Sequence, residues 1–160
     1  MRLVCAFELP EATPSNNTIK GLHFHAYKSL RKRWKGMVCA AARASGTLPA
    51  TERAGASSLA GQASEREPLS LAHIEVERHC AGSLDWDNAL GGLKPLLDCL
   101  VAPSARNPDG QGLILDDSPR CLPRAPAMTQ HLAKRGASRT VVRIYALDAL
   151  DALDAPETAR

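Results

Sequence analysis

The sequence predicts a single α+β domain: a small mixed sheet of about four strands with two main helices on one of its faces. The chain has 160 residues, which is enough for one hydrophobic core and too few for two comfortable ones. Strand-like segments lie near both ends and in the middle, and a long segment with helical periodicity separates the first two. Helices gathered on one face are the usual cover for so small a sheet.

Local patterns predict three of the strands. Residues 3–9 form an apolar run that Pro10 ends. In residues 70–78 apolar and polar side chains alternate, which is typical of a strand with one buried face. Residues 140–146 are rich in β-branched side chains and predict the last strand of the sheet.

The first main helix is predicted over residues 23–43, which contain no proline and are rich in Lys, Arg, Ala and Leu. Its apolar residues recur at three- and four-residue spacing and are expected to form the buried stripe: Tyr27, Leu30, Trp34, Met37, Val38 and Ala41. Basic residues cover the remaining surface. A solvated basic helix and a DNA-contacting one are equally compatible with this pattern.

The second main helix is predicted to be capped by Asp87 or Ser83 and to run to about Leu100. Pro95 is expected to kink it near the glycine pair at 91–92. Four leucines of this segment are expected to face the sheet: Leu90, Leu93, Leu97 and Leu100. At about 100° per residue, Lys94 lies on the same side as Asp87 and beside that apolar stripe.

Two segments are predicted to lie outside the folded part of a domain that covers residues 1–147. Residues 46–67 are punctuated by Gly, Ser and Pro and contain few bulky side chains, so we expect a flexible insertion. Residues 148–160 begin with an Asp-Ala-Leu repeat, whose three-residue period fits neither a helix nor a strand. We expect an acidic, frayed or disordered tail there.

Charge is unevenly distributed, although the formal net charge is only +3. Residues 20–43 contain seven Lys or Arg and no acid, and residues 118–143 contain six and again no acid, whereas residues 85–117 contain six acids and two bases. An acidic centre between basic arms suits a phosphodiester substrate, with a metal ion in the middle and phosphates at the edges. Ordinary solvated faces are the alternative.

Cysteine usage and hydropathy indicate a cytoplasmic protein. The five cysteines are too far apart for a Cys-x-x-Cys metal site and are expected to be reduced thiols. The first apolar run meets Glu8 and Pro10 too early for a signal peptide. No segment approaches the ~20 apolar residues of a membrane span, so we expect no membrane partner.

Two pairs of acids flank the second predicted helix: Asp85 and Asp87 precede it, and Asp116 and Asp117 follow a short apolar run after it. Mg²⁺ typically takes one or two carboxylates together with waters and substrate phosphate. Asp85, Asp87 and Asp117, brought together, would form such a site, and Lys94 would stabilise charge on the phosphate. Aspartates that cap helices and fill turns are the alternative, and the residues alone leave both open.

An ordered set of motifs resembles the RusA family of Holliday-junction resolvases, particularly its phage-type members. The order and approximate spacing of the motifs agree with the family across roughly residues 3–143. The set is Pro14-Ser15-Asn16-Asn17 after the first strand, Asp85-Trp86-Asp87-Asn88, Lys94 with Asp98 four residues later, and Leu115-Asp116-Asp117.

The resemblance implies a RusA-like fold and a homodimeric, Mg²⁺-dependent endonuclease that cuts four-way DNA junctions symmetrically in recombination and repair. Mn²⁺ is an alternative ion, and a phage or prophage origin stays open. The three metal-binding, catalytic aspartates of the family match Asp85, Asp87 and Asp117, with Asp116 as the neighbouring acid. Its functional lysine matches Lys94.

The expected partners are branched DNA and a second copy of the chain. The resemblance implies that residues 118–128 form an edge strand beside the site, and prolines are tolerated in a sheet only at an edge. A DNA-structure-binding protein without catalysis, and a metal nuclease for other branched DNA, are the alternative functions. The candidate DNA contacts are Asn16, Asn17, Lys28, Arg31, Lys32, Arg124, Lys134 and Arg135.

Overall fold

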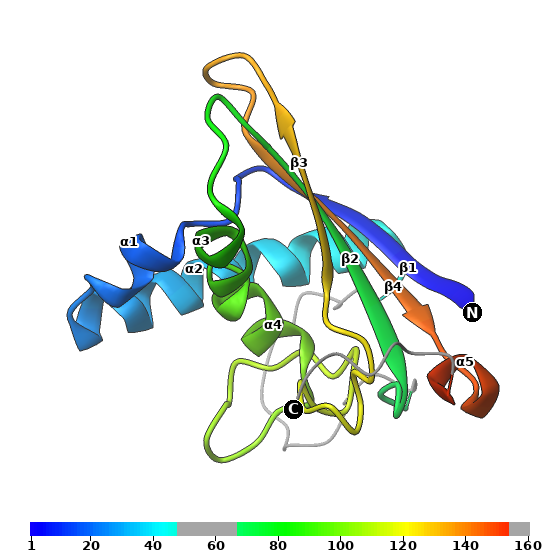
Figure 1. Ribbon diagram of the computed structural model, residues 1–160. Helices are drawn as coiled ribbons and strands as arrows, with labels where there is room; N and C mark the ends of the chain where they lie inside the picture. Colours follow the sequence, from blue (N-terminus) through cyan, green and yellow to red (C-terminus); the bar gives the residue numbers. More distant parts are fainter. Residues whose placement is uncertain (48–66, 154–160) are drawn as a thin grey trace.

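The computed structural model describes residues 1–47 and 67–153. They form an α+β fold around a four-stranded mixed sheet in the order β1-β4-β2-β3 (Figure 1). In chain order the elements are β1 (Arg2–Leu9), α1 (Asn16–Lys20), α2 (Phe24–Ala44), β2 (Ala72–Cys80), α3 (Trp86–Gly91), α4 (Lys94–Leu100), β3 (Ala127–Leu132), β4 (Arg139–Ala146) and α5 (Ala149–Leu153). Strands β2 and β3 are parallel, and the other neighbours are antiparallel. The predicted fold class, with a four-stranded mixed sheet and two main helices, α2 and α4, is confirmed.

The helices cover one face of the sheet. Along β2, Ala72, Ile74 and Val76 are almost completely buried, and the residues between them are only partly buried. Val142 and Ile144 of the neighbouring strand β4 are buried in the same alternating way. All five belong to one core cluster together with side chains of α2 and α4. The opposite face of the sheet consequently carries the polar side chains of both strands.

Helix α2 is the longest helix and packs against β1 and α4. Trp34 and Val38 of its predicted stripe are fully buried, and Leu30, Met37 and Ala41 are partly buried against the core. The stripe predicted from sequence is therefore the face that α2 turns to the sheet. Within the described residues, no helix has both the length and the apolar character needed to cross a membrane.

The predicted second helix is two helices in the structure. α3 ends at Gly91, with Gly92 as its C-cap, and α4 begins at Lys94 with Pro95 in its first turn. Proline is tolerated in the first turn because the N–H that it lacks has no partner within the helix there. The break also shifts the buried side of α4, so Leu96 lies in the core while Leu97, which was expected there, is only partly buried.

The fourth strand of the sheet, β3, lies at its edge. The family resemblance implied an edge strand over residues 118–128, but β3 covers residues 127–132. It begins only after Pro126, because a proline cannot donate to the ladder that pairs β3 with β2. The expectation of an edge strand is confirmed, and its position is corrected.

The start of the predicted tail is a short helix, α5, over residues 149–153. Asp148 and Asp151 cap its first turn reciprocally: the Asp151 N–H donates to Asp148 Oδ1 at 2.8 Å and the Asp148 N–H to Asp151 Oδ2 at 3.3 Å. Asp151 also pairs with the amino group of Met1 at 2.5 Å. The expected disorder is therefore wrong for this turn. Residues 154–160, and nearly all of the insertion predicted at 46–67, lie outside the described residues.

A buried arginine near the C-terminal end of β2 donates hydrogen bonds to two loops. Arg78 is 7% exposed, and its Nε donates to the carbonyl of Thr13 at 3.1 Å while its Nη1 donates to the carbonyl of Gly82 at 2.9 Å. The hydroxyl of Thr140 accepts from the Thr13 N–H and donates to the carbonyl of Glu11. These bonds join the loop after β1 to the loop after β2, and both loops lead into the motifs that the sequence singled out.

We expect Arg78→Ala to lower the free energy of unfolding by about 3 kcal/mol, because it leaves two loop carbonyls without their charged donor. Urea denaturation of the variant and the parent chain measures this difference. Arg78→Lys should fall between them, since an ammonium keeps the charge and loses the fork of the guanidinium.

Arg33→Ala is the matched control for this prediction. Arg33 is also an arginine with an ion-pair partner, Glu11 at 2.8 Å, but its side chain is 58% exposed. Exposed ion pairs contribute about 0–1 kcal/mol, so this variant should unfold close to the parent. Equal losses for Arg78→Ala and Arg33→Ala would contradict the role given to the buried arginine.

Candidate functional site

Asp85 begins helix α3 and is held in place by Asn88. Its Oδ1 accepts from the Asn88 N–H at 2.9 Å and its Oδ2 accepts from the Asn88 side-chain amide at 2.7 Å. The backbone bond from Asn88, followed by the side-chain bond, lowers the pKa of the Asp85 carboxyl. The carboxylate is exposed and ionised at neutral pH, at a helix N-terminus that favours negative charge.

Asp87 lies in the first turn of the same helix and is exposed. Trp86, between the two acids, is 58% exposed, whereas the second tryptophan of the chain, Trp34, is 1% exposed. A large aromatic ring left in solvent between two carboxylates contributes little to the core. It is available to a ligand with a flat apolar face.

Lys94, at the start of α4, pairs with an acid of the second acidic segment and with an acid of its own helix. Its Nζ lies 2.8 Å from Asp117 Oδ2 and 2.8 Å from Asp98 Oδ1. Partial burial lowers the pKa of the Lys94 ammonium, but the hydrogen bonds and charges of Asp117 and Asp98 outweigh it and raise that pKa above its ordinary value. Lys94 is therefore a fixed positive charge beside Asp117.

Asp98 is the more buried of the two carboxylates that pair with Lys94. Its side chain is only 14% exposed, and its Oδ2 lies 3.4 Å from Arg31 Nε and accepts from the Tyr27 hydroxyl at 3.4 Å. Asn107 accepts from the Arg31 guanidinium and donates to the Asp98 carbonyl. Sequence reasoning assigned Tyr27 to the apolar stripe and gave Asn107 no role. No local pattern could have paired residues so far apart in the chain.

Asp116 is exposed beside Asp117 and turns to Ser118. A hydrogen bond from the Ser118 side chain, followed by one from the Asp117 backbone, lowers the pKa of the Asp116 carboxyl, and the charge of Lys94 lowers it further. The two acids of the second pair therefore have different contacts. Asp117 binds the lysine, and Asp116 remains ionised and open to solvent.

The predicted metal ligands supply the right donor atoms without forming a tight cage. Within residues 1–47 and 67–153, the one group of three His, Cys, Asp or Glu side chains with all ligand atoms within 4.8 Å of one another does not include Asp85, Asp87 or Asp117. Mg²⁺ keeps several waters and needs only one or two carboxylates before substrate phosphate arrives. The exposed carboxylates of Asp85 and Asp87 and the partly exposed one of Asp117, with Asp116 as a neighbour, fit that requirement.

The loop after β1 packs directly on helix α3. The Asn17 N–H donates to Asn88 Oδ1 at 3.1 Å, so Asn88 links the first motif to Asp85. Gly91 and Gly92 leave the room for this contact: a Cβ on Gly91 would lie 2.4 Å from the Asn16 side chain, and one on Gly92 would lie 1.8 Å from the Pro14 carbonyl. The glycine pair therefore allows a neighbouring segment of the chain to approach α3 closely.

Lys134 and Arg135, two of the predicted DNA contacts, are exposed in the turn between β3 and β4. That turn begins beside the end of β2, where the Ala133 N–H donates to the Cys80 carbonyl at 2.9 Å. Figure 1 shows it at the same end of the sheet as the loop that leads into α3. Exposed Asn17, in α1, packs on α3 through its hydrogen bond to Asn88.

The other basic candidates are not gathered with them. Lys28 and Lys32 are exposed on α2, whereas Arg31 points to Asp98 and is engaged within the protein. Arg124 donates to the Asp151 carbonyl at 2.8 Å, next to α5, and the structure does not bring it to the acidic site.

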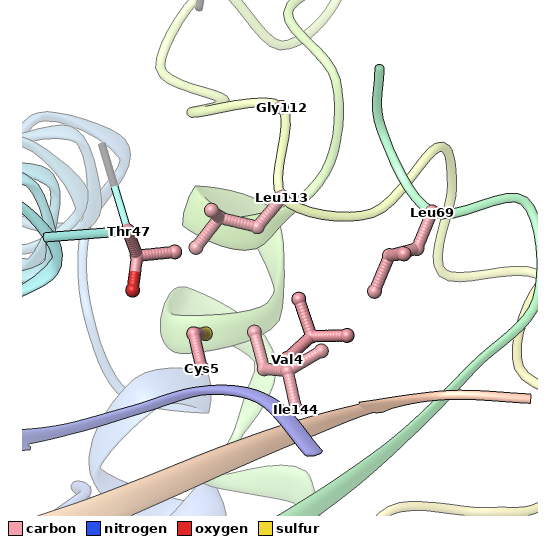
Figure 2. Close-up of a pocket in the computed structure, with 7 residues that line it drawn as sticks. All are labelled: Val4, Cys5, Thr47, Leu69, Gly112, Leu113 and Ile144. Carbon is pink, nitrogen blue, oxygen red and sulfur yellow. The ribbon is translucent and has the colours of Figure 1, made fainter. Parts of the chain in front are cut away.

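An apolar pocket lies apart from these residues. Figure 2 shows its lining, which is aliphatic apart from one thiol, one hydroxyl and a glycine. None of these described residues carries a carboxylate, an imidazole or an amine, so the pocket offers no group for acid–base or metal chemistry. Its lining residues are Val4, Cys5, Thr47, Leu69, Gly112, Leu113 and Ile144.

Comparisons with known proteins give no family for this chain: no family model, no curated protein and no solved structure matches it. The resemblance to RusA-family resolvases therefore rests on the ordered residues themselves. The function that it implies is treated below as a proposal.

We expect Gly92→Ala to push the Pro14 segment off helix α3 and to lower the free energy of unfolding by about 1–3 kcal/mol. The clash is with backbone, which cannot rotate away as a long side chain can. Gly36→Ala is the matched control, since a Cβ there meets nothing within 4 Å inside α2. That variant should gain roughly 0.5–1 kcal/mol, and a gain for Gly92→Ala as well would refute the tight contact.

Proposed function

We propose that this chain is a Mg²⁺-dependent endodeoxyribonuclease that resolves four-way DNA junctions by paired, symmetric cleavage in recombination and repair. Asp85, Asp87 and Asp117 are its metal ligands, Asp116 is the acid beside them, and Lys94 is its basic catalytic residue. Mn²⁺ is the alternative ion. The resemblance to RusA-family resolvases supplies the substrate and the RusA-like fold.

The observation that carries the proposal is the contact of Lys94 with Asp117. It joins the start of helix α4 to the acids that lie after that helix, across 23 positions of sequence. Acids that served only as caps and turn residues would need no ammonium beside them. An ammonium fixed beside carboxylates is, by contrast, a common arrangement for phosphoryl chemistry.

Each residue has a chemical task in this proposal. The metal ion, when bound, supplies an activated water and neutralises the phosphate. Lys94 donates to Asp117 in the structure and can donate to a phosphate oxygen as charge develops there, while Asp98 keeps it aimed. Asn88 fixes both oxygens of Asp85, so that acid needs no reorientation when a ligand arrives.

The DNA contacts of the proposal are polar and basic groups in the turn between β3 and β4 and in α1, with Trp86 at the start of α3. Lys134 and Arg135 would meet phosphates beside the loop into α3, and Asn16 and Asn17 would do so from α1. Trp86 would stack on a base at the branch point, where bases are free to leave the duplex. A homodimer follows from the reaction, because symmetric cleavage of two strands needs two centres related by a two-fold axis.

We expect Asp87→Asn to reduce Mg²⁺-dependent cleavage of a synthetic four-way junction by at least about 100-fold while binding is largely kept. Asp87 is exposed and is not the cap of α3, so its amide should leave the fold intact. Asp109→Asn is the matched control, since that acid pairs with Lys35 on another surface and should cleave like the parent.

Four-way, three-way and linear DNA should be compared in the same assay, with EDTA as the metal-free condition. Cleavage of three-way junctions alone would favour the nuclease of other branched DNA. Undiminished cutting by Asp87→Asn would overturn the assignment of the site. Binding with no nicks under Mg²⁺ or Mn²⁺ would favour a DNA-structure-binding protein in which the acids only cap helices and fill turns.

Trp86 can be tested separately by fluorescence, because the other tryptophan is buried. In EDTA, a four-way junction should quench the emission of the parent chain, and Trp86→Phe should remove most of that change. Trp86→Ala should weaken junction binding by about 10-fold, as expected for one lost base stack. Unchanged affinity and unchanged quenching in both variants would exclude contact of Trp86 with DNA.

A further inference from the structure

A second group of ligand-type side chains lies on the open face of the sheet, away from the aspartates. Glu77 and His79 are two positions apart on β2 and therefore project from the same face. His131 stands directly beside His79 on the parallel edge strand β3. One carboxylate and two imidazoles thus converge from two neighbouring strands.

Their geometry is close to that of a three-ligand metal site. Glu77 Oε2 lies 3.5 Å from His79 Nε2 and 4.0 Å from His131 Nε2, and the three ligand atoms are all within 4.8 Å of one another. Ligand atoms in a tetrahedral zinc site are about 3.4 Å apart, so small side-chain rotations would close the group around an ion. The two imidazole rings are already stacked, with centroids 4.6 Å apart.

Two further contacts point to a missing ligand. Nε2 of His79 is buried and makes no hydrogen bond, although Glu77 is near. Arg143 holds Oε1 of Glu77 at 2.5 Å, which leaves Oε2 facing the imidazoles. The hydrogen bond from Arg143 also lowers the pKa of the Glu77 carboxyl, so the oxygen offered is anionic. A buried polar atom without a partner is costly unless something binds it.

From this geometry we propose that Glu77, His79 and His131 bind a borderline divalent metal ion of the Zn²⁺ class. Two imidazoles and one carboxylate are ligands that Zn²⁺ favours, with water at the fourth position, whereas Mg²⁺ prefers oxygen donors alone. The ion would tie the edge strand β3 to β2 across the ladder. This site is independent of the aspartates and of the nuclease activity proposed above.

The test is Zn²⁺ binding to the full chain, measured by calorimetry and by equilibrium dialysis. We expect one equivalent bound by the parent, and at least a 10-fold loss of affinity in His131→Gln and in Glu77→Gln. The side chain of His131 is 45% exposed, so His131→Gln should fold. His25→Gln is the control: it removes an exposed imidazole that stacks on His23 and should bind Zn²⁺ like the parent.

Two spectroscopic readouts distinguish this site from zinc held by a thiolate or loosely at the surface. Co²⁺ in place of Zn²⁺ should show ligand-field bands without thiolate charge-transfer absorption, since cysteines are not in the group. Zn²⁺ should also slow amide exchange in β3 of the parent and leave it unchanged in His131→Gln. Binding that survives His131→Gln and Glu77→Gln, or no binding above the level of Mg²⁺, would overturn the proposal whatever the nuclease assay gives.

Discussion

The buried guanidinium of Arg78 is the constraint on which the acidic end of this molecule depends. Ordering a loop costs conformational entropy, and two loops that are far apart in the sequence meet here. Arg78 replaces a hydrophobic contact with two charged hydrogen bonds to backbone carbonyls, one in each loop. Because it stands on the rigid central strand β2, the motifs that follow Thr13 and Gly82 are fixed relative to the sheet and to each other.

The polar residues of the site are of two kinds: some are hydrogen-bonded within the protein, and others are oriented by them. Asn88 and Asp98 are engaged by the protein: Asn88 bonds to Asp85 and Asn17, and Asp98 bonds to Lys94 and Arg31. Of the groups that they hold, Asn17, Asp85 and Lys94 are exposed, whereas the side chain of Arg31 is only 20% exposed. This division gives a reason for polar residues at positions that contribute little to the core, since orienting a charge requires donors and acceptors in fixed places.

How much could be predicted from the sequence depends on how local each signal is. Helix α2 and strands β1, β2 and β4 follow from periodicity, which acts over neighbouring residues, and their predicted positions agree with the structure to within a few residues. The break after Gly91 and the late start of β3 depend on where Pro95 and Pro126 fall relative to hydrogen-bond ladders formed elsewhere. The side chain of Arg31 is held within the protein by Asp98 and Asn107. Both lie far from α2 in the sequence, so no pattern within α2 could predict these contacts.

The edge strand β3 links the two polar regions of the molecule. Its successive side chains point to opposite faces, so His131 lies with Glu77 on the open face while Gln130 turns to the helical side. There Gln130 both accepts from the Leu84 N–H at 2.9 Å and donates to the Leu84 carbonyl at 2.8 Å, one residue before Asp85. Edge strands fray more readily than central ones because only one side is paired. Any ligand that fastened His131 to β2 would therefore also steady Gln130, and with it the backbone from which the acidic helix begins.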